Sequence, residues 1–153
     1  MKIFVCAVLV LGLVACSKNT TTTTPSPINT LNTGATISLD LAKSLRVVED
    51  GIRSANTAGA ASNDTTASVL RLTARINKAG LDADAVLRSQ TALTATQKVS
   101  ITTLLSPLVT AIQTAIDQDA VKISNSATQN QIKTALAAIQ LTIKSTLAAL
   151  GGN

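Results

Sequence analysis

The sequence lacks most of the side chains that perform chemistry in proteins. It has no His, Trp or Tyr, and its only Phe, its only Met and both Cys lie among the first sixteen residues, at Phe4, Met1, Cys6 and Cys16. After Cys16 a Ser-His-Asp or Cys-His arrangement is therefore excluded, as is a zinc or copper site made of imidazole and thiolate ligands. We expect no enzyme activity, no metal and no cofactor.

Charged residues are scarce as well. They make up 14% of the chain, against about a quarter in an average domain, while the hydrophobic share is an ordinary 46%. This is not the composition of a charge-rich disordered chain, and 153 residues fit one folded domain. The net charge is +5, but we do not expect nucleic acid as a partner, because no aromatic side chain after Phe4 is available to stack on bases.

The N-terminus has the pattern of an export sequence. Lys2 precedes a thirteen-residue apolar run, Ile3–Ala15, after which the chain turns polar. A helix of that length reaches about 20 Å, short of the ~30 Å hydrocarbon core of a bilayer. The run therefore fits the apolar part of a secretory signal peptide better than a permanent transmembrane anchor.

The end of the apolar run resembles the lipobox of bacterial lipoproteins, with Leu13, Val14, Ala15 and Cys16 in order. The resemblance implies that the lipoprotein signal peptidase recognises the first three residues and cleaves before Cys16, whose thiol carries a diacylglycerol. Two or three acyl chains anchor a protein stably in a membrane, where one is marginal. Ser17 implies the outer membrane, by the rule of enteric lipoproteins. An ordinary signal peptide with a chance Cys and an uncleaved anchor are the alternatives.

After the signal peptide (1–15), the chain divides into a tether and a helical domain. Residues 16–35 are rich in Thr, Asn and Pro without an apolar period, which predicts a disordered tether, or alternatively a glycosylated stalk. In residues 36–153 apolar side chains recur every three or four positions, which predicts amphipathic helices. The four apolar stripes are Ile37, Leu41, Leu45, Val48, Ile52 and Ala55; Val69, Leu72, Ile76 and Ala79; Ile101, Leu105, Leu108, Ile112, Ile116 and Ile123; and Ile132, Leu136, Ile139, Ile143, Leu147 and Leu150.

Four main amphipathic helices with short connections predict an all-α fold, an antiparallel up-and-down helical bundle. Asn63 or Asp64 is expected to cap the second helix, and Gly80 to end it. Asp82 would then cap one additional short helix. Formation of a homo-oligomer through an uncovered apolar stripe stays open.

The third helix contains a proline. Thr94–Gln97 matches a capping box and predicts where this helix begins. Pro107 then removes a hydrogen bond and crowds the preceding turn. Because the apolar spacing stays in phase across Pro107, we favour a kink; a break with Ser106 as the cap of a new helix is the alternative.

Candidate contact residues lie on the second predicted helix. Arg71, Arg75 and Lys78 are spaced i, i+4 and i+7 and share one side of it. They form either an ordinary solvated face or a contact surface for phosphate groups of anionic lipid or for an acidic envelope polymer. Two pairs of carboxylates, Asp82 with Asp84 and Asp117 with Asp119, are two residues apart and diverge by about 200° on a helix, which argues against a shared metal ion. A weak calcium site is the alternative.

The sequence thus predicts a lipid-anchored, non-catalytic protein of the bacterial cell envelope that acts as a structural or binding module. Its expected partners are the membrane, through acyl chains on Cys16, and an envelope protein or anionic envelope polymer. The alternative function is a carrier or sensor that holds an apolar ligand between the helices.

Overall fold

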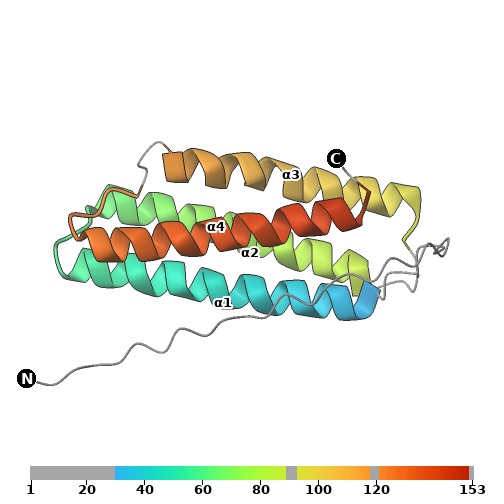
Figure 1. Ribbon diagram of the computed structural model, residues 1–153, viewed down its shortest axis with the longest axis horizontal. Helices are drawn as coiled ribbons and strands as arrows, with labels where there is room; N and C mark the ends of the chain where they lie inside the picture. The colour runs from blue at the N-terminus through green and yellow to red at the C-terminus, as the bar shows by residue number, and fades with distance from the viewer. Residues whose placement is uncertain (1–29, 89–92, 118–120, 152–153) are drawn as a thin grey trace, which may run out of the picture.

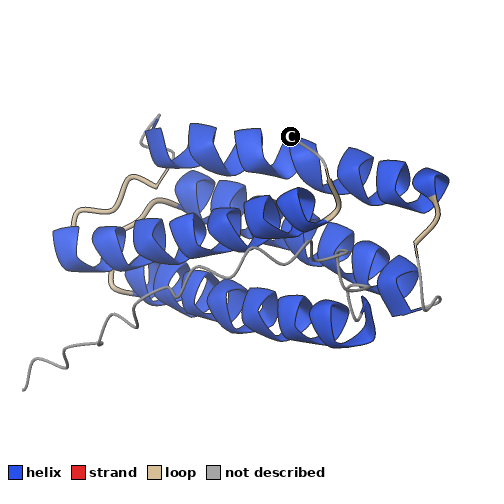
Figure 2. Ribbon diagram, turned by 45° about the vertical axis from the view of Figure 1, so that its right-hand side comes forward, coloured by secondary structure: helices blue, strands red, loops and turns tan. Residues whose placement is uncertain are grey.

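A computed structural model of the chain describes residues 30–88, 93–117 and 121–151, with side chains from Ser38 onward. This part contains four helices: α1 (Thr30–Thr57), α2 (Asn63–Arg88), α3 (Ala95–Asp117) and α4 (Ser126–Ala149). Apart from one isolated β-bridge, the regular structure of the described residues is entirely helical (Figure 2).

The helices form an antiparallel bundle in which successive helices run in opposite directions (Figure 1). α1 packs on α2 and α4, and α3 packs on the same two helices, so each helix lies beside two neighbours and faces the remaining helix across the core. The four helices therefore surround a single core. The predicted all-α, up-and-down bundle is confirmed.

Most of the core comes from the predicted apolar stripes; the side chain of Ile37 lies outside the described residues. All four helices contribute to one cluster of buried side chains. Within the helices, the following side chains of these stripes have no exposed surface: Val48, Ile52, Ile76, Ile101, Ile112, Ile132, Leu136 and Ile139. Leu72, Ile116 and Leu147, also in the stripes, are only partly buried against this cluster. Helical periodicity thus identified the inward face of each helix correctly.

α2 does not end at Gly80 as the sequence predicted. It continues without a break to Arg88, so the prediction of an additional short helix capped by Asp82 is wrong. Gly80 is buried against α1: a Cβ atom at this position would lie 3.2 Å from Leu41 Cδ1. The glycine therefore allows α1 to come close, and this packing outweighs the roughly 1 kcal/mol that a glycine costs inside a helix.

Two further boundaries differ from the prediction. α1 begins at Thr30, inside the range 16–35 that was assigned to the tether. The positions that would continue its stripe from Ile37 toward the N-terminus, Thr33 and Gly34, are not apolar, so the sequence shows no helical period there. Ile123 is buried as expected, but it lies beyond the end of α3, in a β-bridge with Ala61.

α3 continues through Pro107, so the alternative of a break at Ser106 is wrong. Proline has no N–H group, and the carbonyl of Thr103, four residues earlier, therefore lacks its helical donor. Pro107 itself is exposed, whereas Leu105 and Leu108 on either side are buried. Core packing of these two leucines holds the helix together across the proline.

Side-chain caps set the helix starts. The predicted capping box is confirmed: Gln97 Oε1 accepts from the Thr94 N–H at 2.9 Å, and Thr94 Oγ1 accepts from the Gln97 N–H at 3.3 Å. The cap of α2 is Ser62, whose Oγ accepts from the N–H three residues later at 3.1 Å. Asn63 and Asp64, the predicted caps, lie in the first turn instead.

Two connections meet at one end of the bundle. Gly59, with φ of +70°, turns the chain out of α1. Beyond this turn, Ala61 pairs with Ile123 in the antiparallel β-bridge, and the Ser124 N–H donates to the Ala60 carbonyl at 2.9 Å. The loop between α1 and α2 is thereby joined to the segment that precedes α4.

Candidate functional site

The residues predicted for lipidation lie outside the described part of the chain: Leu13, Val14, Ala15 and Cys16, with Ser17. Thirteen residues, 17–29, separate Cys16 from Thr30, where α1 begins. The start of α1 lies at the same end of the bundle as the start of α3 and the end of α4 (Figure 1). We call this the anchor end, because a lipid on Cys16 would be connected to it.

The basic stripe of α2 lies on the surface. Arg71, Arg75 and Lys78 are all exposed. Lys78 Nζ lies 2.8 Å from Asp82 Oδ2, and the two side chains are 77% and 43% exposed, so water screens the pair and it adds little stability. Neither arginine has a carboxylate partner within the described residues. Contact of this stripe with an anionic surface stays a prediction.

Asp82 and Asp84 do not share a site. Asp82 pairs with Lys78, while Asp84 Oδ2 lies 2.7 Å from Arg88 Nε. Both are i, i+4 pairs along α2, which favour continuation of the helix past Gly80. In the part of the chain that the structure describes, no group of three or more His, Cys, Asp or Glu side chains could hold a metal ion.

A small cavity lies inside the bundle near Gly80. Its volume is about 10 Å³, and its wall includes Ser38, Asp84 and Thr146 from three different helices. Ser38 Oγ and Asp84 Oδ1 are buried and have no hydrogen-bond partner among the described residues. Such a volume is about that of one water molecule. This cavity therefore gives no support to the alternative of an apolar-ligand carrier.

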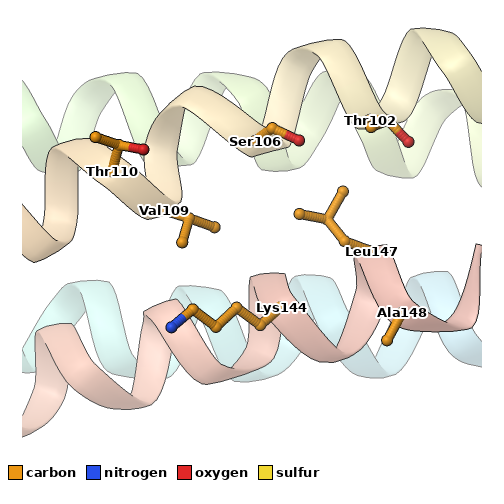
Figure 3. Close-up of a pocket in the computed structure, with 7 residues that line it drawn as sticks. All are labelled: Thr102, Ser106, Val109, Thr110, Lys144, Leu147 and Ala148. Carbon is orange, nitrogen blue, oxygen red and sulfur yellow. The ribbon is translucent and has the colours of Figure 1, made fainter. Parts of the chain in front are cut away.

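A larger hollow runs along the surface between α3 and α4 (Figure 3). One stretch of about 400 Å³ is lined by Thr102, Ser106, Val109 and Thr110 of α3 and by Lys144, Leu147 and Ala148 of α4. An adjoining stretch of about 390 Å³ shares Thr102 and extends past Lys98 to Gly151, at the anchor end. Val109 and Leu147 point into the space between the two helices. We call the two stretches together the α3–α4 groove.

α3 itself is unusual in composition. It is the one helix among those described that is long and apolar enough, by length and composition, to cross a membrane. A core helix of a soluble protein passes the same test, and α3 packs on α2 and α4 through buried side chains such as Ile101 and Ile112. We therefore interpret α3 as a bundle helix whose outer face carries no charge between Lys98 and Asp117.

A buried amide joins the two walls of the groove. Gln140 of α4 is 8% exposed, and its Nε2 donates to the Val109 carbonyl at 3.0 Å and to Gln113 Oε1 at 2.9 Å. Gln113 Nε2 in turn donates to both carboxylate oxygens of Asp117 at 2.8 Å. A buried amide with its donors satisfied in this way fixes the position of α4 against α3.

Replacing Gln140 with Ala should lower the free energy of unfolding by about 1–2 kcal/mol, because it removes two hydrogen bonds from a buried site. The control is Gln131→Ala, at an exposed position of the same helix, which should change stability by less than about 0.5 kcal/mol. Thermal unfolding followed by circular dichroism measures both. Equal stability of the two variants would contradict a holding role for Gln140.

Sequence reasoning missed both the groove and the buried polar residues. Thr73, Gln140 and Thr146 are buried, but an apolar period does not select polar side chains. Spacing alone could have found Thr73, which lies four residues after Val69 and three before Ile76. For the groove, one indication was present in the sequence: no charged residue occurs between Lys98 and Asp117.

No protein-family model, no curated protein and no solved structure matches the chain. The assignment of function therefore depends on its own residues and geometry.

Proposed function

We propose that this protein is a lipid-anchored, non-catalytic module of a bacterial cell envelope that acts by structure or by binding. The observation that carries the proposal is the run Leu13–Cys16 at the end of a short apolar segment, which resembles a lipobox. Ser17 favours the outer membrane as the destination. Acyl chains on Cys16 would supply the membrane attachment.

The side-chain inventory supports a non-catalytic role. After Cys16 the chain has no His, Cys or Tyr, and its only Glu is Glu49. General acid–base catalysis at neutral pH would fall to Asp, Lys or this Glu, each of which needs a strongly shifted pKa for that task. Two of the Asp carboxylates, those of Asp82 and Asp84, are instead engaged in ion pairs with Lys78 and Arg88.

The bundle also suits a binding role, because it presents two distinct surfaces. One is the basic stripe of Arg71, Arg75 and Lys78 on α2, and the other is the α3–α4 groove. An envelope protein or an anionic envelope polymer fits the predominance of positive charge on both.

Replacing Cys16 with Ala tests the anchor. We expect the wild-type chain to incorporate a labelled fatty acid and to stay with membranes after alkaline extraction, and the Cys16→Ala chain to lose the label, because the thioether can no longer form. Cys6→Ala is the matched control and should behave as wild type. Undiminished labelling of the Cys16→Ala chain would refute lipidation at this residue.

A further inference from the structure

The α3–α4 groove has the dimensions of a docking site for one helix. It extends along α3 from Ala95 to Thr110, which is about 22 Å at 1.5 Å per residue, or four turns of helix. On α3 its wall includes small hydroxyl side chains at every fourth position, Thr102, Ser106 and Thr110, beside the apolar Val99 and Val109. Small side chains allow another helix to come close, since the distance between packed helices depends on the side chains at the contact.

The charged side chains among the described residues that line the groove are both positive. They are Lys98 and Lys144, and none of the described lining residues is a carboxylate. α3 and α4 together carry four charged residues, three of them basic, whereas α1 and α2 carry thirteen of both signs. A partner with negative charge is therefore complementary to this groove.

The chemistry of the groove disfavours an extended peptide, a bilayer surface, a sugar polymer and the chain's own residues 17–29 as its occupant. An extended peptide would bring unpaired backbone N–H and C=O groups, which two helices with satisfied backbones cannot match. A bilayer surface is flat and does not enter a groove. A sugar polymer would lack aromatic side chains to stack on, because none follows Phe4. The chain's own residues 17–29 contain Lys18 and no Asp or Glu, so they do not complement Lys98 and Lys144.

A helix meets each requirement. Its backbone hydrogen bonds are satisfied internally, and an apolar stripe on it would cover Val99, which is 64% exposed, and the part of Val109 and Leu147 that faces the groove. Acidic residues beside that stripe would meet Lys98 and Lys144.

We propose that the α3–α4 groove binds an amphipathic, acidic helix of a partner protein of the envelope. This inference rests on the proposed binding function and names the site and the chemical class of the partner. The groove opens at the anchor end, where the predicted lipid would hold it near proteins at the membrane surface.

Site-specific photo-crosslinking in cells tests the proposal with the full-length chain. A photoreactive amino acid replaces Ser106 in the groove, and the control carries it at Ser54, which is exposed on α1. We expect a crosslinked partner from position 106 only, attached through a residue of a helix that carries Asp or Glu. In the chain with the photoreactive residue at position 106, the double variant Lys98→Glu/Lys144→Glu should reduce the yield of the crosslink about tenfold or more. The double variant Lys98→Arg/Lys144→Arg should preserve it.

Other outcomes overturn the proposal. The proposal fails if position 106 gives no crosslink, or if position 54 gives an equal one. It also fails if the crosslink joins position 106 to a second copy of this chain, to lipid or to a glycan, or if the charge reversal does not change the crosslink. Thermal unfolding of the Lys98→Glu/Lys144→Glu chain establishes that it is folded. Fatty-acid labelling in the same cells separates the two proposals: a labelled chain without the crosslink leaves the anchor intact and refutes only the groove.

Discussion

Replacing Ile139 with Ala should lower the free energy of unfolding by about 2–5 kcal/mol, the usual range for removing a large buried aliphatic side chain. Ile139 has no exposed surface and lies in the middle of α4, the helix that packs on both α1 and α3. Ile139 belongs to the cluster of buried side chains to which all four helices contribute, so the cost depends on how far this cluster can collapse into the cavity. For a domain of this size each kcal/mol lowers Tm by roughly 4 °C.

Leu141→Ala is the matched control, because it removes a similar aliphatic side chain two residues away on the same helix. Leu141 is 66% exposed, so its replacement should change stability by less than about 0.5 kcal/mol. Chemical denaturation of both variants at one pH measures the difference. Similar losses at Ile139 and Leu141 would show that α4 is not oriented as described.

Replacing Pro107 with Ala should have the opposite effect and raise the free energy of unfolding by about 2 kcal/mol. A proline inside a helix costs about 3 kcal/mol relative to Ala. Proline also restricts the unfolded chain, which favours the folded state by about 0.4–1 kcal/mol and offsets part of this cost. Alanine supplies the missing N–H to the Thr103 carbonyl. Because Pro107 is exposed, its removal leaves no cavity in the core.

Pro107→Gly separates the two causes of this gain. Glycine restores the N–H group but lacks the helix propensity of Ala, so this variant should be less stable than Pro107→Ala by about 1 kcal/mol. Thermal unfolding of all three chains gives the comparison. A loss of stability in Pro107→Ala would mean that the native backbone at this turn depends on the proline ring.

Much of the fold could be predicted because burial and helical period coincide in this sequence. Leu41, Ile76 and Leu136 belong to stripes that any bundle must turn inward, whatever the neighbouring helix. Gly80 was misread because its role depends on Leu41 of another helix, and a local reading sees only a residue that commonly ends helices. Ser38 was missed for a related reason: a small polar residue at a core position gives no periodic signal.

The candidate sites differ in the same way. The predicted lipobox is a local motif, so a resemblance to it can be recognised from the order of Leu13 to Cys16 alone. The α3–α4 groove depends on how two helices lie against each other, and Lys98 and Lys144 are 46 positions apart in the chain. Nothing in the sequence near either lysine indicates that the other lines the same groove.

The β-bridge between Ala61 and Ile123 makes one backbone amide a reporter of bundle assembly. The Ser124 N–H donates to the Ala60 carbonyl, so its protection from hydrogen exchange requires the α1–α2 hairpin and the segment before α4 to be in place together. Amides within a single helix can stay protected from exchange when one hairpin separates from the other. The Ser124 amide loses its protection when this happens. Its exchange rate therefore measures how often the two halves of the bundle separate at the end where α1 joins α2.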